Sequence, residues 1–133
     1  MLAAFLADAV RTRFEWGKRD CCLFPADWVR LNRGTDPAAA YRGRYGSETE
    51  CAAVLERGGG LAAVASAGAA LAGLQPVEQP ESGDVGVVRV LSLVGDRYEA
   101  VQVGAIFTGR RWAVLTPDGL LTLPAEPVMA WRV

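Results

Sequence analysis

The stretch that organises this chain is Trp16-Gly17-Lys18-Arg19-Asp20-Cys21-Cys22. Asp20 precedes a segment with apolar residues at helical spacing, which runs through Trp28 and stops at Gly34. An aspartate before such a segment is a typical N-cap, and a glycine after it is a typical C-cap. The stretch therefore predicts a helix that begins close to Cys21.

A cysteine at the start of a helix has a chemical use, because free backbone N–H groups and the helix dipole stabilise a thiolate there. Cys21 is therefore a candidate nucleophile. The alternative is that Cys21 is a small buried apolar residue, as free cysteines often are. Asp20 is in the first place a helix cap. Packing is the simplest role for Cys22, and Cys51 is expected in the core.

Four further helices are predicted before residue 75. Apolar residues on one face indicate a helix over Leu2–Thr12, and the cap-like pair Asp36-Pro37 indicates a short helix over Ala38–Arg42. Ser47-Glu48-Thr49-Glu50 has the capping-box pattern and predicts a helix that ends before Gly58, followed by an Ala-rich helix from Leu61.

The pattern changes after residues 75–83, which contain two prolines and a Ser-Gly pair and are expected to form a surface connection. Short strands separated by turn residues follow. They are predicted at 85–88, 98–107, 112–115, 120–123 and 128–133. We therefore expect one α+β domain over residues 1–133, with N-terminal helices (1–74) packed on a C-terminal antiparallel sheet or small barrel (84–133).

The overall composition excludes several classes of function. The 14 basic and 15 acidic residues give a net charge of −1, so the chain lacks the basic surface of a nucleic-acid-binding protein. The longest uncharged stretch, residues 58–77, is mostly Ala and Gly, and no membrane span is expected. Three cysteines without any histidine do not make a typical zinc set, so no metal or cofactor is expected. They also make no disulfide framework, which favours a reducing compartment.

Three short motifs resemble those of NlpC-type cell-wall peptidases, which have a papain-like fold. Trp16-Gly17 followed by Asp20-Cys21-Cys22 is similar to their Trp-Gly … Asp-Cys-Ser entry, and Ser82-Gly83-Asp84-Val85 is similar to their Pro-Gly-Asp-Leu segment. Gln102-Val103-Gly104-Ala105-Ile106 resembles their His-Val-Gly-Ile strand. Together with Ala26-Asp27-Trp28-Val29 and Ala130-Trp131-Arg132-Val133, they most resemble small tail proteins of phages and phage-like gene transfer particles.

The resemblance implies a site and a location. It places Cys21 at the nucleophile position and Gln102 at the histidine position, with Asp20 and Asp84 as further site residues. It implies a location in the virion tail, with hub and neighbouring tail proteins as partners and peptidoglycan as a possible ligand. A papain-like arrangement also predicts that the side chains of Cys21 and Gln102 approach to about 3–6 Å, as a nucleophile and its base do.

The departure from the family is the histidine, because glutamine cannot carry a proton between thiol and leaving amine. Standard Cys–His catalysis within this chain is therefore excluded. We expect a structural subunit of a phage-type tail tip on a degenerate peptidase-like scaffold. The alternative is a peptidoglycan peptidase with Cys21 as nucleophile and acid–base help from Asp84 or another subunit. Because aromatic residues and methionine are enriched in interface cores, the strand at Trp112 and the segment Val128–Trp131 are expected to contact partner chains.

Overall fold

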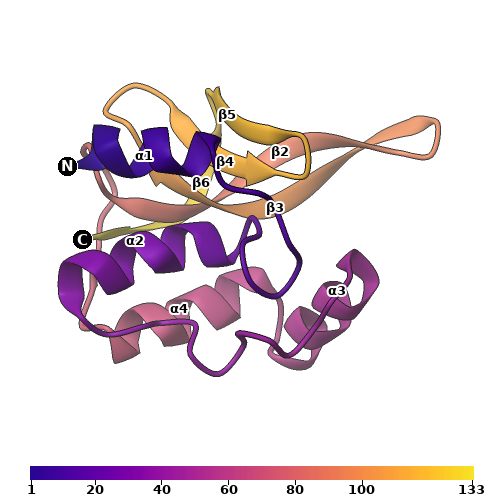
Figure 1. The fold of residues 1–133 in the computed structure, drawn as a ribbon, viewed down its shortest axis with the longest axis horizontal. Helices are drawn as coiled ribbons and strands as arrows, with labels where there is room; N and C mark the ends of the chain where they lie inside the picture. The colour runs from indigo at the N-terminus through magenta and orange to yellow at the C-terminus, as the bar shows by residue number, and fades with distance from the viewer.

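The computed structural model describes residues 1–133 as four helices followed by six strands (Figure 1). The helices are α1 (Leu2–Val10), α2 (Leu23–Arg33), α3 (Glu48–Arg57) and α4 (Leu61–Leu71). The strands are β1 (Gln75–Pro76), β2 (Val85–Val94), β3 (Arg97–Phe107), β4 (Trp112–Thr116), β5 (Gly119–Leu123) and β6 (Glu126–Arg132). The α+β class and the order of helices before strands are as predicted. No helix has the length and apolar character needed to cross a membrane.

The strands form one antiparallel sheet in the order β1-β6-β2-β3-β4-β5. The sheet is open, so the expectation of a small barrel is wrong. Closure would require β1 to pair with β5, but β1 has only two residues and pairs only with β6. The longest ladder joins β2 to β3, and this hairpin extends away from the body of the domain (Figure 1).

Apolar clusters lie on the two faces of the sheet. Alternate residues of a strand point to opposite faces. The larger cluster fills the space between the sheet and the helices, with Phe24 and Trp28 of α2 against Val87 and Ile106. The smaller cluster, on the opposite face, is made of strand residues alone: Val88, Ala105, Trp112, Val114 and Ala130.

The aromatic side chains of the expected partner interface belong to these clusters. Trp112 is 2% exposed and Trp131 is 4% exposed, so neither is available at the surface of the folded chain. The expectation is therefore wrong for these two side chains, while contacts through half-buried Val128 and Met129 stay a prediction. The burial of the two tryptophans has a plain cause, because a large aromatic side chain gains most from being packed inside its own domain.

The short helix expected over Ala38–Arg42 is replaced by turns. Asp36 does accept a hydrogen bond from the N–H of Ala38 at 3.0 Å, as a cap would. However, the Arg42 side chain reaches back to the carboxylate of Asp36 (2.6 Å) and across to that of Asp27 (2.8 Å) in α2. These ion pairs hold the segment as a loop against α2, and they outweigh its local preference for a helix.

The end of α2 and the start of α3 agree with their sequence signals, whereas α1 ends at Val10, two residues before the predicted Thr12. The N–H of Glu50 donates to the Ser47 hydroxyl at 3.1 Å at the start of α3. Gly34 ends α2 in the left-handed conformation, with a φ of 74°. Strand β2 is longer than predicted, because it continues to Val94, past the expected end at Val88.

Gly68 of α4 provides a test of the helix packing. A Cβ at this position would lie 2.6 Å from the carbonyl oxygen of Pro37. In an exposed helix, Gly→Ala stabilises by about 1 kcal/mol. Here we expect Gly68→Ala to lower the free energy of unfolding by about 1–3 kcal/mol, because the loop must move. Urea denaturation measures the change.

The matched control is Ala67→Gly, on the exposed side of the same helix. It should cost about 1 kcal/mol through helix propensity alone. A stabilising Gly68→Ala would contradict the close approach of α4 to Pro37.

Candidate functional site

The carboxylate of Asp20 is fully buried, with 0% exposure, and accepts four hydrogen bonds. Three come from backbone N–H groups: Gly17 at 2.9 Å, Cys22 at 3.0 Å and Leu23 at 2.9 Å. The fourth comes from the Tyr45 hydroxyl at 2.6 Å. Asp20 is thus the cap that the sequence predicted. Each of its two oxygens accepts two of these hydrogen bonds, so the carboxylate has no free acceptor site for another role.

The cap changes what Cys21 can do. Cys21 directly follows the capping Asp20, and the N–H of Phe24 donates to the Asp20 carbonyl oxygen at 2.9 Å, which begins the helical hydrogen bonds before the first regular residue of α2 at Leu23. The N–H groups of Cys22 and Leu23, which would otherwise face a thiolate, donate to Asp20. The anion bound at this helix start is therefore the Asp20 carboxylate.

All three cysteines of the chain belong to this neighbourhood. The Sγ atoms of Cys21 and Cys22 are 4.0 Å apart. Contact with the thiols of Cys21 and Cys51, together with burial, raises the pKa of Cys22 well above its usual value. The neighbouring Cys22 thiol lowers the pKa of Cys51. Cys51 is 4% exposed, which confirms the prediction that it lies in the core.

Asp20, Cys21 and Cys22 have their potential ligand atoms within 4.8 Å of one another. A metal ion held there would need the Asp20 carboxylate to give up N–H and hydroxyl partners that are themselves buried. Burying unpaired donors costs about 1–3 kcal/mol each. The three residues therefore make a poor metal site.

Strand β3 passes close to the start of α2, as the resemblance requires. Gly104 lies beside this start: a Cβ there would lie 2.8 Å from the carbonyl oxygen of Cys21 and 2.9 Å from Cγ of Pro25. Gln102 lies two residues before Gly104 on β3, on the same face of the strand, and is exposed. The prediction that Gln102 lies on a strand is thus confirmed, while the 3–6 Å approach to Cys21 stays a prediction.

Asp84 lies elsewhere along the sheet. It follows Gly83, whose carbonyl oxygen accepts a hydrogen bond from Nε1 of Trp28, about one and a half turns into α2. The Asp84 carboxylate pairs with Arg132 at 3.1 Å and accepts the N–H of Glu81 at 2.7 Å. Val87, which pairs with Gly104, is three strand positions further on, or about 10 Å at 3.3 Å per residue. The structure therefore does not bring Asp84 to Cys21.

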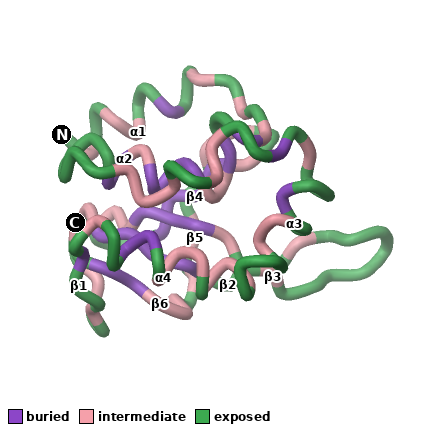
Figure 2. The backbone as a smooth tube through the Cα atoms, turned by 90° about the horizontal axis from the view of Figure 1, so that it is seen from below, coloured by how far each residue is buried: buried purple, intermediate pink, exposed green.

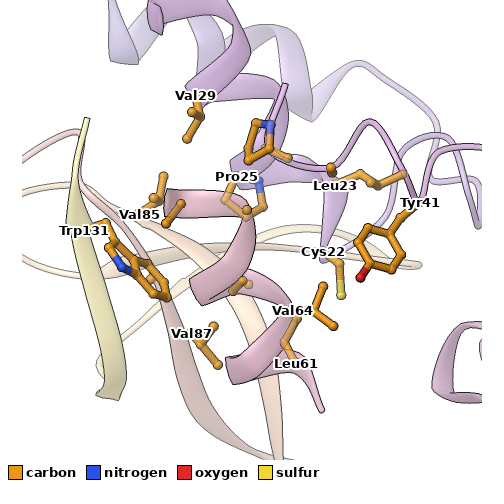
Figure 3. Close-up of a pocket in the computed structure, with 18 of the residues that line it drawn as sticks. Cys22, Leu23, Pro25, Val29, Tyr41, Leu61, Val64, Val85, Val87 and Trp131 are labelled. Carbon is orange, nitrogen blue, oxygen red and sulfur yellow. The ribbon is translucent and has the colours of Figure 1, made fainter. Parts of the chain in front are cut away.

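An apolar pocket of about 90 Å³ lies between α2, α4 and the sheet. Figure 3 shows Cys22 and Tyr41 with Val64 and Leu61 at one end, and Val29, Val85 and Trp131 at the other. No charged side chain lines it. Polar atoms are limited to groups such as the Cys22 thiol and the tyrosine hydroxyls. Such a pocket suits an apolar group.

Sequence reasoning missed Tyr45. Its hydroxyl hydrogen bond to Asp20, together with burial of the side chain, raises the pKa of Tyr45 far above its ordinary value. Twenty-five positions separate the two residues, and no local pattern joins them. The convergence of Cys51 on Cys22 was missed for the same reason.

One protein-family model matches the chain, over residues 1–133, and it is described as "Domain of unknown function (DUF6950)". The chain belongs to that family. Comparisons with curated proteins and with solved structures give no match.

The Asp20 network predicts a large effect of its removal on stability. Asp20→Ala leaves buried donors without a partner and removes the cap of α2. We expect the free energy of unfolding to fall by about 3 kcal/mol or more, measured by chemical denaturation. Asp20→Asn keeps one acceptor oxygen and should cost less.

Asp118→Ala, in the exposed β4–β5 turn, is the matched control. It should change stability by no more than about 0.5 kcal/mol. If Asp20→Ala is as mild as this control, the four hydrogen bonds do not hold the site together.

Proposed function

We propose that this member of the DUF6950 family is a structural subunit of a phage-type tail tip, which uses a papain-like scaffold to bind hub and neighbouring tail proteins. The observation that carries the proposal is the surroundings of Cys21. The N–H groups at its helix start donate to the Asp20 carboxylate, and the residue that the resemblance puts at the position of the base is Gln102, on the neighbouring strand β3.

The proton balance of amide hydrolysis supports a non-catalytic role. A thiolate must form for attack, and the leaving amine must then receive a proton. Gln102 can do neither. Asp20 is saturated by its four hydrogen bonds, and Asp84 is paired with Arg132 away from the site. None of the three residues that the resemblance assigns to the site beside Cys21 is therefore able to carry the proton.

The pocket next to Cys22 also argues against a peptidase. Cell-wall peptides carry carboxylates and amines, and a site that binds them needs polar or charged groups to orient them. The pocket offers no charged group that could pair with them, since its lining is apolar apart from thiol and hydroxyl groups. Burial of a peptide carboxylate there would be costly.

The tail-tip location rests on the motif resemblance. The motifs at 26–29 and 130–133 include Trp28, Val29 and Trp131. These three residues lie in the core and thus specify the scaffold. A scaffold can keep its partners after its chemistry is lost. Because Trp112 and Trp131 are buried, contacts with hub and tail proteins must use other residues.

The test is complementation in a strain that produces the particles. Deletion of the gene should prevent assembly of complete tails, as seen by electron microscopy and by the titre of competent particles. Cys21→Ser should restore the titre to within about twofold, because serine is nearly isosteric and no step needs a thiolate. Asp20→Ala, which destabilises the fold, should restore much less.

Three results would overturn this function. One is a folded Cys21→Ser protein that assembles into tails but leaves the particles inactive. The second is release of stem peptides from purified peptidoglycan by the wild-type protein, abolished by the same substitution. The third is normal assembly of tails without the gene, which would exclude the structural role.

The papain-like arrangement can be tested by restoring the missing base. Gln102→His should place an imidazole near Cys21 and increase the thiolate fraction at pH 7, which is only a few per cent for an ordinary thiol. We expect alkylation of Cys21 by iodoacetamide to become about tenfold faster. Peptide mapping by mass spectrometry follows Cys21 separately from the other cysteines.

Ala100→His is the matched control, because it lies on the same strand and the same face, two residues further from Gly104. It should leave the alkylation rate of Cys21 unchanged. An equal rate in the Gln102→His variant and the wild type would show that Gln102 does not occupy the position of the peptidase histidine.

A further inference from the structure

The β2–β3 hairpin is a two-stranded ribbon for much of its length. Strand β6 pairs with β2 only as far as Arg89, which lies opposite Glu126. The outer edge of β2 from Val90 to Val94 therefore has no neighbouring strand. Figure 2 shows this outer part of the ribbon in green, as exposed backbone beyond the helices. An isolated two-stranded ribbon is only marginally stable in water, so this segment gains from further pairing.

The free edge of β2 reads Val90-Leu91-Ser92-Leu93-Val94. It contains no charge and no proline, and four of its five residues favour strands or apolar surroundings. Leu91 is 74% exposed, Leu93 is 60% exposed and Val94 is 49% exposed. Natural proteins protect exposed edges with charges, prolines or bulges. Because this edge has no charge or proline to protect it, we expect another chain to cover it.

The five residues form a palindrome about Ser92, and this property selects the partner. In an antiparallel pair of identical strands related by a two-fold axis at Ser92, Leu91 faces Leu93 of the second copy. Val90 likewise faces Val94 of the second copy. Each like-for-like pair occurs twice, as an isologous interface requires. The two leucine pairs lie on one face of the sheet, because paired residues of neighbouring strands point the same way.

The two edges of the ribbon differ in charge. The free edge of β2 has no charged residue between Val90 and Val94. The unpaired outer edge of β3, by contrast, carries Arg97 and Glu99 and has no such symmetry. That edge has the charges that discourage strand addition.

We infer that the chain forms a two-fold homodimer through the Val90–Val94 edge of β2, which joins two six-stranded sheets into one antiparallel sheet. The inference is independent of the tail-tip function, since it uses only the free edge and its sequence. The occupant of the edge is a second copy of this chain.

The first test is the mass in solution, measured by light scattering after size exclusion over a dilution series. The wild type should reach twice the chain mass of 14.1 kDa and dissociate on dilution. Leu93→Lys should remain monomeric at concentrations where the wild type is dimeric, because two ammonium groups would enter the leucine cluster. Circular dichroism checks that this exposed substitution leaves the fold intact.

Glu99→Lys is the matched control, since it adds a lysine at a similar distance from the hairpin turn but on β3. It should leave the dimer unchanged. A wild type that is monomeric at every concentration, including one that binds another tail protein through this ribbon, would overturn the inference. So would a dimer that Glu99→Lys disrupts and Leu93→Lys does not.

The second test examines the register. On the two-fold axis, the Cα atoms of the two Ser92 residues would be about 4.5–5.5 Å apart, which a disulfide spans. Ser92→Cys should therefore crosslink under mild oxidation to a covalent dimer on non-reducing gels. Leu91→Cys should crosslink several-fold less, because its equivalent is diagonal, about 7–8 Å away. Equal crosslinking of the two variants would exclude pairing about Ser92, and the wild type gives the background from the native cysteines.

Discussion

One buried carboxylate, that of Asp20, holds together the part of the molecule on which the rest depends. A charge without exposure is tolerated only when its hydrogen-bonding needs are met, and here three backbone N–H groups and the Tyr45 hydroxyl meet them. The carboxylate thereby joins the loop before α2, the first turn of α2 and the segment before α3. With α2 fixed in this way, its apolar residues meet the sheet in a single orientation. The same hydrogen bonds remove Asp20 from any role in proton transfer.

The sequence was informative where the signal is local. Asp20 and Gly34 bracket α2, and Ser47 marks the start of α3, because caps act within a few residues of the backbone groups that they satisfy. The strands were recognisable from runs of β-branched and apolar residues between turns. Strand β2 was predicted too short, because Arg89 interrupts the buried run and the exposed residues beyond it still form a strand through pairing with β3.

The remaining features depend on contacts between distant residues, which no local pattern encodes. Arg42 determines that residues 37–43 form turns, through ion pairs that reach α2. Tyr45 and Cys51 join the site from segments with no chemical motif. For the candidate site, the sequence correctly predicted that Gln102 lies on a strand. Gly104 of the same strand lies close to the backbone of Cys21. The sequence also predicted that Asp20 caps this helix start, but it did not reveal that Tyr45 donates the fourth hydrogen bond to the same carboxylate. Trp112 and Trp131 illustrate the same limit, because residue type alone does not distinguish an interface aromatic from a core aromatic.

The place of β6 within the sheet has a consequence for synthesis on the ribosome. Residues 126–132 lie between β1 and β2, so the central ladder of the sheet needs a segment that is translated after every other strand. Arg132, which is paired with Asp84, completes the turn into β2 only at that point. Until then, the helices and the β2–β3 hairpin can form, but the edge of β2 that pairs with β6 has no partner. The nascent chain therefore passes through a stage in which a buried strand is open to pairing with other chains.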